Sequence, residues 1–137
     1  MIQTENAKAQ MRKGVLELCI LSILSQGEAY PTEIIEKLKK QKLVVVEGTL
    51  YPLLTRLKNT DLLTYRWEES NSGPPRKYYF LTKAGKTYLS DLQSSWYDMV
   101  SSVNKTIQNK SHSLLALRLL EFHGNLHRFF FTMFNFI

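Results

Sequence analysis

The pattern of apolar and polar positions divides the first 60 residues into three segments that each predict a helix. Residues 12–26 hold a dense apolar run, and its length favours a helix that is buried on most sides. Residues 31–41 begin with Pro31, which suits the first position of a helix, and they have an apolar side and a cluster of lysines at the C-terminal end, where cations are favoured. An extended run at 44–46 then leads into a third helix, predicted at 47–59. Leucines line one face of this third helix at helical spacing: Leu50, Leu53, Leu54 and Leu57.

The following residues predict a hairpin and then a long helix. Residues 63–69 and 77–81 have the composition of two strands, and the turn-forming residues at 70–75 predict the tip between them. The last helix is expected at 83–109, with Thr82 as its N-terminal cap. An apolar seam runs along this helix with steps of three and four residues, which is typical of helices that pair with another copy. The seam consists of Leu89, Leu92, Trp96, Met99, Val103 and Ile107.

This order of elements predicts a mainly α fold of the α+β class, namely a winged helix-turn-helix with a two-stranded wing and a long C-terminal dimerisation helix. We place the winged helix-turn-helix DNA-binding domain at 11–82 and the dimerisation helix at 83–110. Residues 111–137 form an atypical apolar tail of unknown function, which holds all three histidines and six of the seven phenylalanines. Three interpretations of the tail stay open: a packed helix, a segment on a membrane surface, or an abnormal extension of the reading frame.

Composition narrows the class of protein. A chain of 137 residues with 44% hydrophobic residues is about one domain in length and can bury a core. The net charge of +6 favours a polyanionic partner, and residues 1–110 hold 16 of the basic and 11 of the acidic side chains. The single cysteine, Cys19, excludes a disulfide framework and a four-cysteine zinc site. No signal peptide or membrane-spanning run is evident, so we expect a cytoplasmic protein without a membrane partner.

The third helix and the wing carry the candidate chemistry. In a winged helix-turn-helix, this helix enters the major groove of double-stranded DNA, and the wing contacts the backbone or the minor groove. Arg56 suits bidentate recognition of guanine, and Thr49 or Thr55 suits a thymine methyl group or a phosphate. The basic residues that directly follow the hairpin tip are suited to bind phosphates of the DNA backbone. The predicted DNA-binding set is Thr49, Tyr51, Pro52, Thr55, Arg56, Lys58, Arg76 and Lys77.

Two short motifs stand out in the third helix and the second strand. Residues 48–52 read Gly-Thr-Leu-Tyr-Pro, and residues 76–82 read Arg-Lys-Tyr-Tyr-Phe-Leu-Thr, with Gly85 shortly after. These motifs resemble those of the PadR family of bacterial transcriptional regulators. The resemblance covers about residues 11–109 and fits the short form of the family, which has a single C-terminal dimerisation helix. One departure lies at residues 31–32, where Pro-Thr stands in place of the usual Gly-Tyr pair.

The resemblance implies a homodimeric repressor that binds a pseudo-palindromic operator. Members of the family control detoxification or drug-efflux genes, often in response to small aromatic molecules. In some drug-sensing members a tryptophan of the dimerisation helix stacks against flat ligands at the dimer interface. By this resemblance, Trp96 and the neighbouring Met99 form the candidate effector site.

Trp96, Tyr51 and the chain as a whole also allow interpretations other than the one that the resemblance implies. Trp96 packs the dimer interface with or without a ligand, and Tyr51 either contacts DNA or packs against the scaffold. Two alternative functions compete with DNA-binding regulation. One is a winged-helix module that binds a protein without sequence-specific DNA binding, and the other is a ligand-binding dimer without a regulatory DNA role. No enzyme signature is found, and no cofactor is predicted. No metal site is predicted either, because His123 and His127 lack a third ligand.

Overall fold

The structure is a computed structural model that describes the backbone of residues 2–70 and 73–133, and the side chains of the same ranges as far as residue 108. The chain divides into two compact units, Met1–Ser94 and Ser95–Ile137. The first unit contains α1 (Ile2–Ser25), α2 (Pro31–Lys40), α3 (Glu47–Asn59), β1 (Leu63–Ser70) and β2 (Gly73–Leu81), together with the beginning of α4 (Lys83–Met133). The second unit is formed by the rest of α4.

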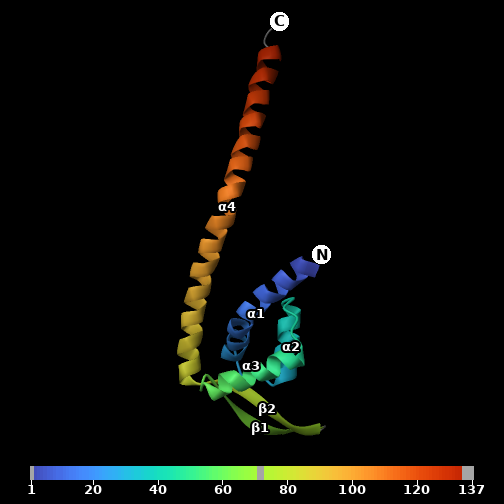
Figure 1. Ribbon diagram of the computed structural model, residues 1–137, viewed down its shortest axis with the longest axis vertical. Coiled ribbons are helices and arrows are strands. Elements are labelled where there is room, and N and C mark those ends of the chain that lie inside the picture. Colours follow the sequence, from blue (N-terminus) through green and yellow to red (C-terminus); the bar gives the residue numbers. More distant parts are fainter. Residues whose placement is uncertain (1, 71–72, 134–137) are drawn as a thin grey trace. The chain divides into compact units, whose positions relative to one another are not determined.

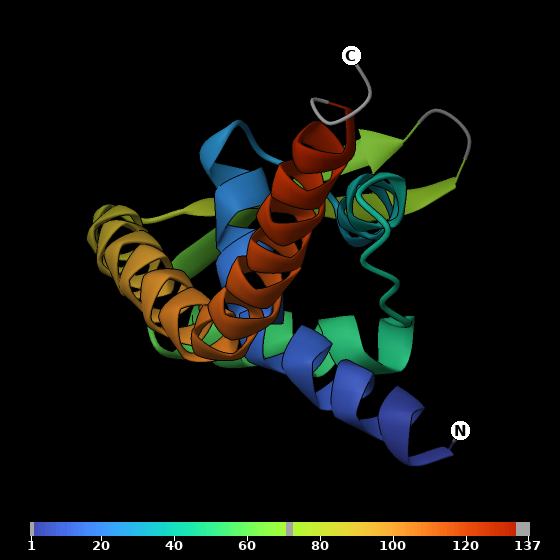
Figure 2. The same ribbon diagram turned by 90° about the horizontal axis from the view of Figure 1, so that it is seen from above.

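The core of the first unit is built from the apolar faces of three helices and the hairpin. Figures 1 and 2 show α1, α2 and α3 on one side of the two antiparallel strands. The fully buried side chains come from all of these elements: Ile20, Leu21, Ile34, Leu38, Leu50, Leu54, Leu57 and Leu63. Burial of this many aliphatic side chains is the main force that holds α3 in place, so its opposite side is left for solvent or a partner.

The loop between α1 and α2 is fastened to the wing. Ala29 and Tyr79 exchange two backbone hydrogen bonds, with N–O distances of 3.1 and 2.9 Å. The backbone N–H of Tyr30 donates to the Glu33 carboxylate at 3.1 Å, which satisfies one of the free donors at the start of α2. These bonds fix the first turn of α2 beside β2.

Thr82 caps α4, as predicted. Its hydroxyl accepts a hydrogen bond from the Gly85 N–H at 2.9 Å and donates to the Asp61 carbonyl at 2.6 Å. Gly85 lies so close to the loop between α3 and β1 that a Cβ atom on it would be 2.0 Å from the carbonyl oxygen of Leu62. The absence of a side chain at Gly85 therefore allows α4 to start against this loop.

The bounds of three elements differ from those predicted. The first helix begins at Ile2 and not at residue 12, because residues 2–11 favour a helix without an apolar stripe. The second strand begins at Gly73 and includes two prolines, which are tolerated because a two-stranded sheet has only edge strands. The last helix continues past residue 109 to Met133. The bounds of α2 and α3 agree with the prediction to within one residue.

Candidate nucleic-acid interface

The outer side of α3 is exposed along its length. Leu50, Leu54 and Leu57 face the core, as the leucine stripe predicts. Pro52 is the sixth residue of the helix, so the helix lacks the backbone hydrogen bond from residue 52 to the carbonyl of Gly48, which is an exposed residue. The helix begins after Val46, whose extended backbone (φ −101°, ψ 154°) makes the turn from the preceding segment.

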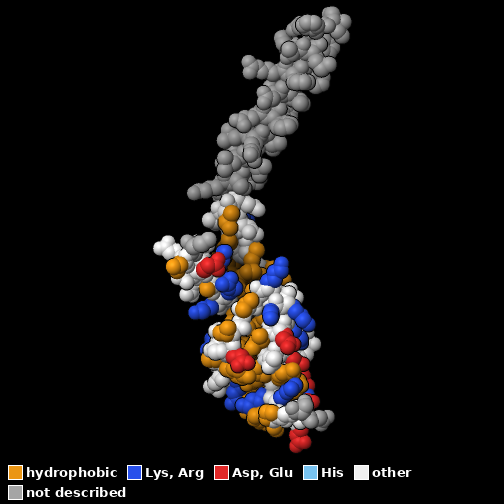
Figure 3. Space-filling view, turned by 90° about the vertical axis from the view of Figure 1, so that its right-hand side faces the viewer, with side chains coloured by type: hydrophobic (Ala, Val, Ile, Leu, Met, Phe, Trp, Pro, Cys, Tyr) orange, Lys and Arg blue, Asp and Glu red, His pale blue; other side chains and the backbone are white. Residues whose placement is uncertain are grey.

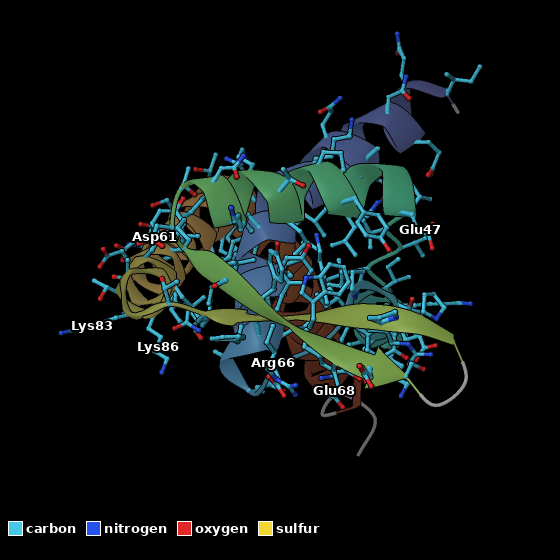
Figure 4. The ribbon with its side chains drawn as sticks, turned by 90° about the horizontal axis from the view of Figure 1, so that it is seen from below. Glu47, Asp61, Arg66, Glu68, Lys83 and Lys86 are labelled. Atoms are coloured by element: carbon cyan, nitrogen blue, oxygen red, sulfur yellow. The ribbon has the colours of Figure 1, made fainter. Side chains whose placement is uncertain are left out.

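A groove lies between the outer side of α3, the start of α2 and the wing. Its volume is about 520 Å³. Figure 4 shows side chains filling the region between α3 and the two strands. The contacts of α3 with the hairpin are made mainly by β1. Four of the predicted DNA-binding residues line the groove: Tyr51, Thr55, Arg76 and Lys77. The structure therefore brings together residues that are 26 positions apart in the sequence.

Aromatic rings hold both wing cations in place. The Lys77 ammonium lies 4.5 Å from the ring centre of Tyr65 and 5.0 Å from that of Trp67. The Arg76 guanidinium lies 4.6 Å from the ring centre of Tyr30. Such contacts restrict a long cationic side chain without neutralising it, so its hydrogen-bond donors are still available to a phosphate. At the lower end of Figure 3, where the hairpin lies, basic side chains stand beside hydrophobic ones.

Among the described residues, six other lining residues were not in the predicted set, and two of these, Tyr30 and Trp67, contact the wing cations. Trp67 is 59% exposed on β1, and Tyr30 is the residue before α2. The sequence contains a signal for the first, because Tyr65 and Trp67 alternate with charged residues along a strand that lies at an edge. No comparable pattern marks Tyr30, whose position depends on the packing of α2 against β2.

The other predicted residues of α3 lie elsewhere. Arg56 is turned toward α1, where its Nη2 forms an ion pair with Oε2 of Glu17. Thr49 lines a separate hollow of about 170 Å³ beside α1. Pro52 and Lys58 are exposed. The predicted set is thus one cluster of four residues, two residues on the α1 side of α3, and two at the surface.

An ion-pair network lies on the face of the hairpin that carries Arg76, because Glu68 is the cross-strand partner of Arg76 and Arg66 lies two residues before Glu68. Arg66 donates from Nε to Glu28 at 2.9 Å and also pairs with Glu68, with an N–O distance of 2.6 Å (Figure 4). The hydrogen bonds from Arg66 lower the pKa of Glu28 below its ordinary value, and the two carboxylates raise the pKa of Arg66. Because two carboxylates neutralise Arg66, this arginine is a poor partner for a phosphate.

The predicted seam on α4 differs in exposure along its length. Leu89 is buried in the core of the first unit, and Leu92 packs against that core. Trp96 is half-buried. In the second unit, Met99, Val103 and Ile107 are 51%, 48% and 64% exposed. The exposed apolar part of the seam therefore lies beyond Trp96.

The described part of the chain contains neither a membrane-spanning helix nor a cluster of metal ligands. Among these residues, no helix has both the length and the apolar character needed to cross a membrane. No three His, Cys, Asp or Glu side chains gather within the same ranges as a metal site would require. The side chains of His123 and His127 lie outside the described residues.

Comparison with known proteins gives the family. The family of PadR-like transcriptional regulators matches residues 20–91, which include α2, α3, the hairpin and the beginning of α4. The chain belongs to the PadR-like family of transcriptional regulators. All eight predicted DNA-binding residues lie within the matched PadR-like segment.

Solved PadR-like proteins share this fold. A PadR-like transcription factor from Bacteroides fragilis is 58% identical, with 72% of this chain and 96% of that chain covered and a TM-score of 0.62. A PadR-like regulator from Bacillus cereus is 43% identical, with 72% and 97% covered and a TM-score of 0.66. The PadR of Bacillus subtilis, solved in complex with operator DNA, is 29% identical, with 58% and 46% covered and a TM-score of 0.54. The winged-helix fold expected from the PadR resemblance is confirmed.

Proposed function

We propose that this PadR-like chain is a DNA-binding transcriptional regulator that acts as a homodimeric repressor. The observation that carries the proposal is the groove in which Tyr51 and Thr55 of α3 face Arg76 and Lys77 of the wing. Such a groove combines groups that fit base edges with cations that fit phosphates. The Bacillus subtilis PadR, which was solved with operator DNA, supports DNA as the partner.

The proposed mode of binding places α3 in the major groove and the wing on the adjacent backbone. Tyr51 and Thr55 then face the bases, and the ring-held Arg76 and Lys77 meet phosphates beside them. In a homodimer, two copies of α3 enter successive major grooves, about 34–36 Å apart, on a pseudo-palindromic operator. Each neutralised phosphate releases counterions, so the affinity for DNA falls as salt rises.

The proposed regulation uses the beginning of the exposed seam on α4. Trp96 is half-buried and Met99 is exposed one turn further along the helix, so a flat aromatic molecule has both a ring and a flexible side chain to contact. A ligand that prefers one dimer shape would shift the population between a DNA-binding and a non-binding form. The genes proposed to be controlled encode detoxification or drug-efflux functions.

A binding titration with matched variants tests the DNA-binding proposal. The probe is a labelled duplex from the region upstream of the protein's own gene, and a shuffled duplex of the same length is the control. The wild-type chain is expected to prefer the first duplex, with an affinity that falls steeply with salt. Lys77→Ala is expected to weaken binding to both duplexes and to reduce the salt slope by about 0.9.

Lys83→Ala is the matched control for charge. Lys83 is exposed at the start of α4, away from the groove (Figure 4), so its loss should leave the slope unchanged. Absence of DNA binding at low salt, or binding that does not depend on salt, would refute the proposed function.

A further inference from the structure

Glu17 connects three helices of the first unit through its two carboxylate oxygens. Oε2 pairs with the guanidinium of Arg56 on α3. Oε1 accepts a hydrogen bond from the Tyr88 hydroxyl on α4 at 2.8 Å. The side chain of Glu17 is 19% exposed, whereas that of Arg56 is 59% exposed. One partly buried acid on α1 therefore holds the exposed arginine of the candidate DNA-binding helix.

The pair of Glu17 and Arg56 reduces the positive charge that α3 offers to DNA. An arginine contributes to affinity by placing a net positive charge on a phosphate or a guanine edge. While Arg56 stays paired with Glu17, the two side chains carry no net charge between them. When Arg56 leaves for DNA, the carboxylate of Glu17 stays behind with a lost partner in a partly desolvated position, which is unfavourable. In both cases Glu17 reduces the contribution of Arg56 to the affinity for DNA.

We propose that Glu17 is an internal competitor of DNA for the guanidinium of Arg56. The inference rests on the proposed DNA-binding function and identifies a positioning residue outside the groove itself. Glu17 lies before the segment that matches the PadR-like family, so the family match does not include it.

Tyr88 connects this competition to α4. The hydrogen bond to Glu17 raises the pKa of the Tyr88 hydroxyl, which therefore stays protonated and keeps donating. Tyr88 also packs against the hydrophobic core beside the buried Leu89. A shift in the first turns of α4 would therefore move the Tyr88 hydroxyl, which orients Glu17, and would change the position of Glu17 relative to Arg56.

The test compares salt slopes of DNA binding in the full chain. Glu17→Gln keeps the shape and the acceptor for Tyr88 but removes the charge that holds Arg56. The variant is expected to bind duplex DNA more tightly, by up to about eightfold at 0.1 M salt, with a slope steeper by about 0.9. Glu5→Gln is the matched control, because it removes the same charge from α1 where the partner is Lys8 and not Arg56. Its slope should equal that of the wild type.

Two further variants separate charge competition from damage to the fold. Tyr88→Phe removes the hydrogen bond to Glu17 but keeps both charges of the Glu17–Arg56 pair, so it should not reproduce the full steepening of the salt slope expected for Glu17→Gln. In an Arg56→Gln background, Glu17→Gln should no longer steepen the slope, because there is no guanidinium to release. Thermal unfolding of each variant reports on stability separately.

The outcomes distinguish the two proposals. If the wild type binds DNA with salt dependence but Glu17→Gln leaves both affinity and slope unchanged, the competition is refuted and the DNA-binding function stands. Steepening that persists in the Arg56→Gln background, or that Glu5→Gln reproduces, also refutes the competition. If neither wild type nor variants bind any duplex, both proposals fail.

Discussion

At the scale of single residues, the aromatic side chains of the wing decide how its cations are presented. Lys77 lies over two rings, and of these Trp67 is the more exposed. We expect Trp67→Ala to weaken DNA binding by about two- to fivefold, because an exposed cation–π contact is worth about 0.5–1 kcal/mol. Anisotropy titration measures this, with Tyr97→Ala as the control for loss of an exposed aromatic residue on α4. An equal effect of both substitutions would contradict the role of Trp67.

Cys19 gives a residue-scale prediction for pH. Burial beside the core raises the pKa of its thiol, since the thiolate is disfavoured where water is excluded. Cys19 is the only cysteine, so its reaction with a thiol reagent such as DTNB is a clean measurement. We expect slower labelling than for free cysteine at neutral pH, and a rise in rate only above the ordinary thiol pKa. Labelling as fast as free cysteine at neutral pH would show that the thiol is open to solvent.

The sequence predicts which side of α3 a residue lies on better than it predicts which residue its side chain contacts. Tyr51 and Thr55 could be assigned to the outer side of α3 because helical spacing alone separates them from the leucine stripe. Arg56 is also on this side by spacing, yet its guanidinium pairs with Glu17, 39 positions earlier. Such a contact depends on how α1 crosses α3, which no local pattern encodes.

At the scale of elements, the junction before α4 gives a stability prediction. Gly85→Ala would place a methyl group 2.0 Å from the carbonyl oxygen of Leu62, so the loop or the helix must shift. We expect a loss of about 1–3 kcal/mol or more in the free energy of unfolding, measured by urea denaturation. Gly14→Ala is the matched control, because nothing lies within 4 Å of an added Cβ there. That substitution should stabilise α1 by about 0.5–1 kcal/mol.

Elements with a strong apolar period were predicted more closely than those without one. The stripe of α3 and the proline at the start of α2 mark both helices correctly. The first ten residues of α1 have no buried side chain, so the hydrophobic pattern gives no sign of the helix there. The start of the second strand, which includes Pro74 and Pro75, was missed because proline usually marks a loop, and only the two-stranded topology makes these prolines acceptable.

At the scale of the whole molecule, the exposed seam of α4 predicts assembly. Val103 and Ile107 are apolar and exposed one turn apart, which favours burial against a second copy. Val103→Glu should therefore produce monomers in analytical ultracentrifugation. Because a monomer reads only one half-site, we also expect its affinity for the full operator to fall by at least about tenfold.

Ser101→Glu is the matched control for this substitution, since it adds the same charge to α4 at an exposed position on the other side of the helix from the seam. It should leave both the dimer and operator binding intact. If Val103→Glu stays dimeric, the seam is not the interface. If it becomes monomeric without loss of operator affinity, two copies of α3 are not needed together. Only the combined loss, absent from Ser101→Glu, supports a homodimer that reads both half-sites through the groove between α3 and the wing.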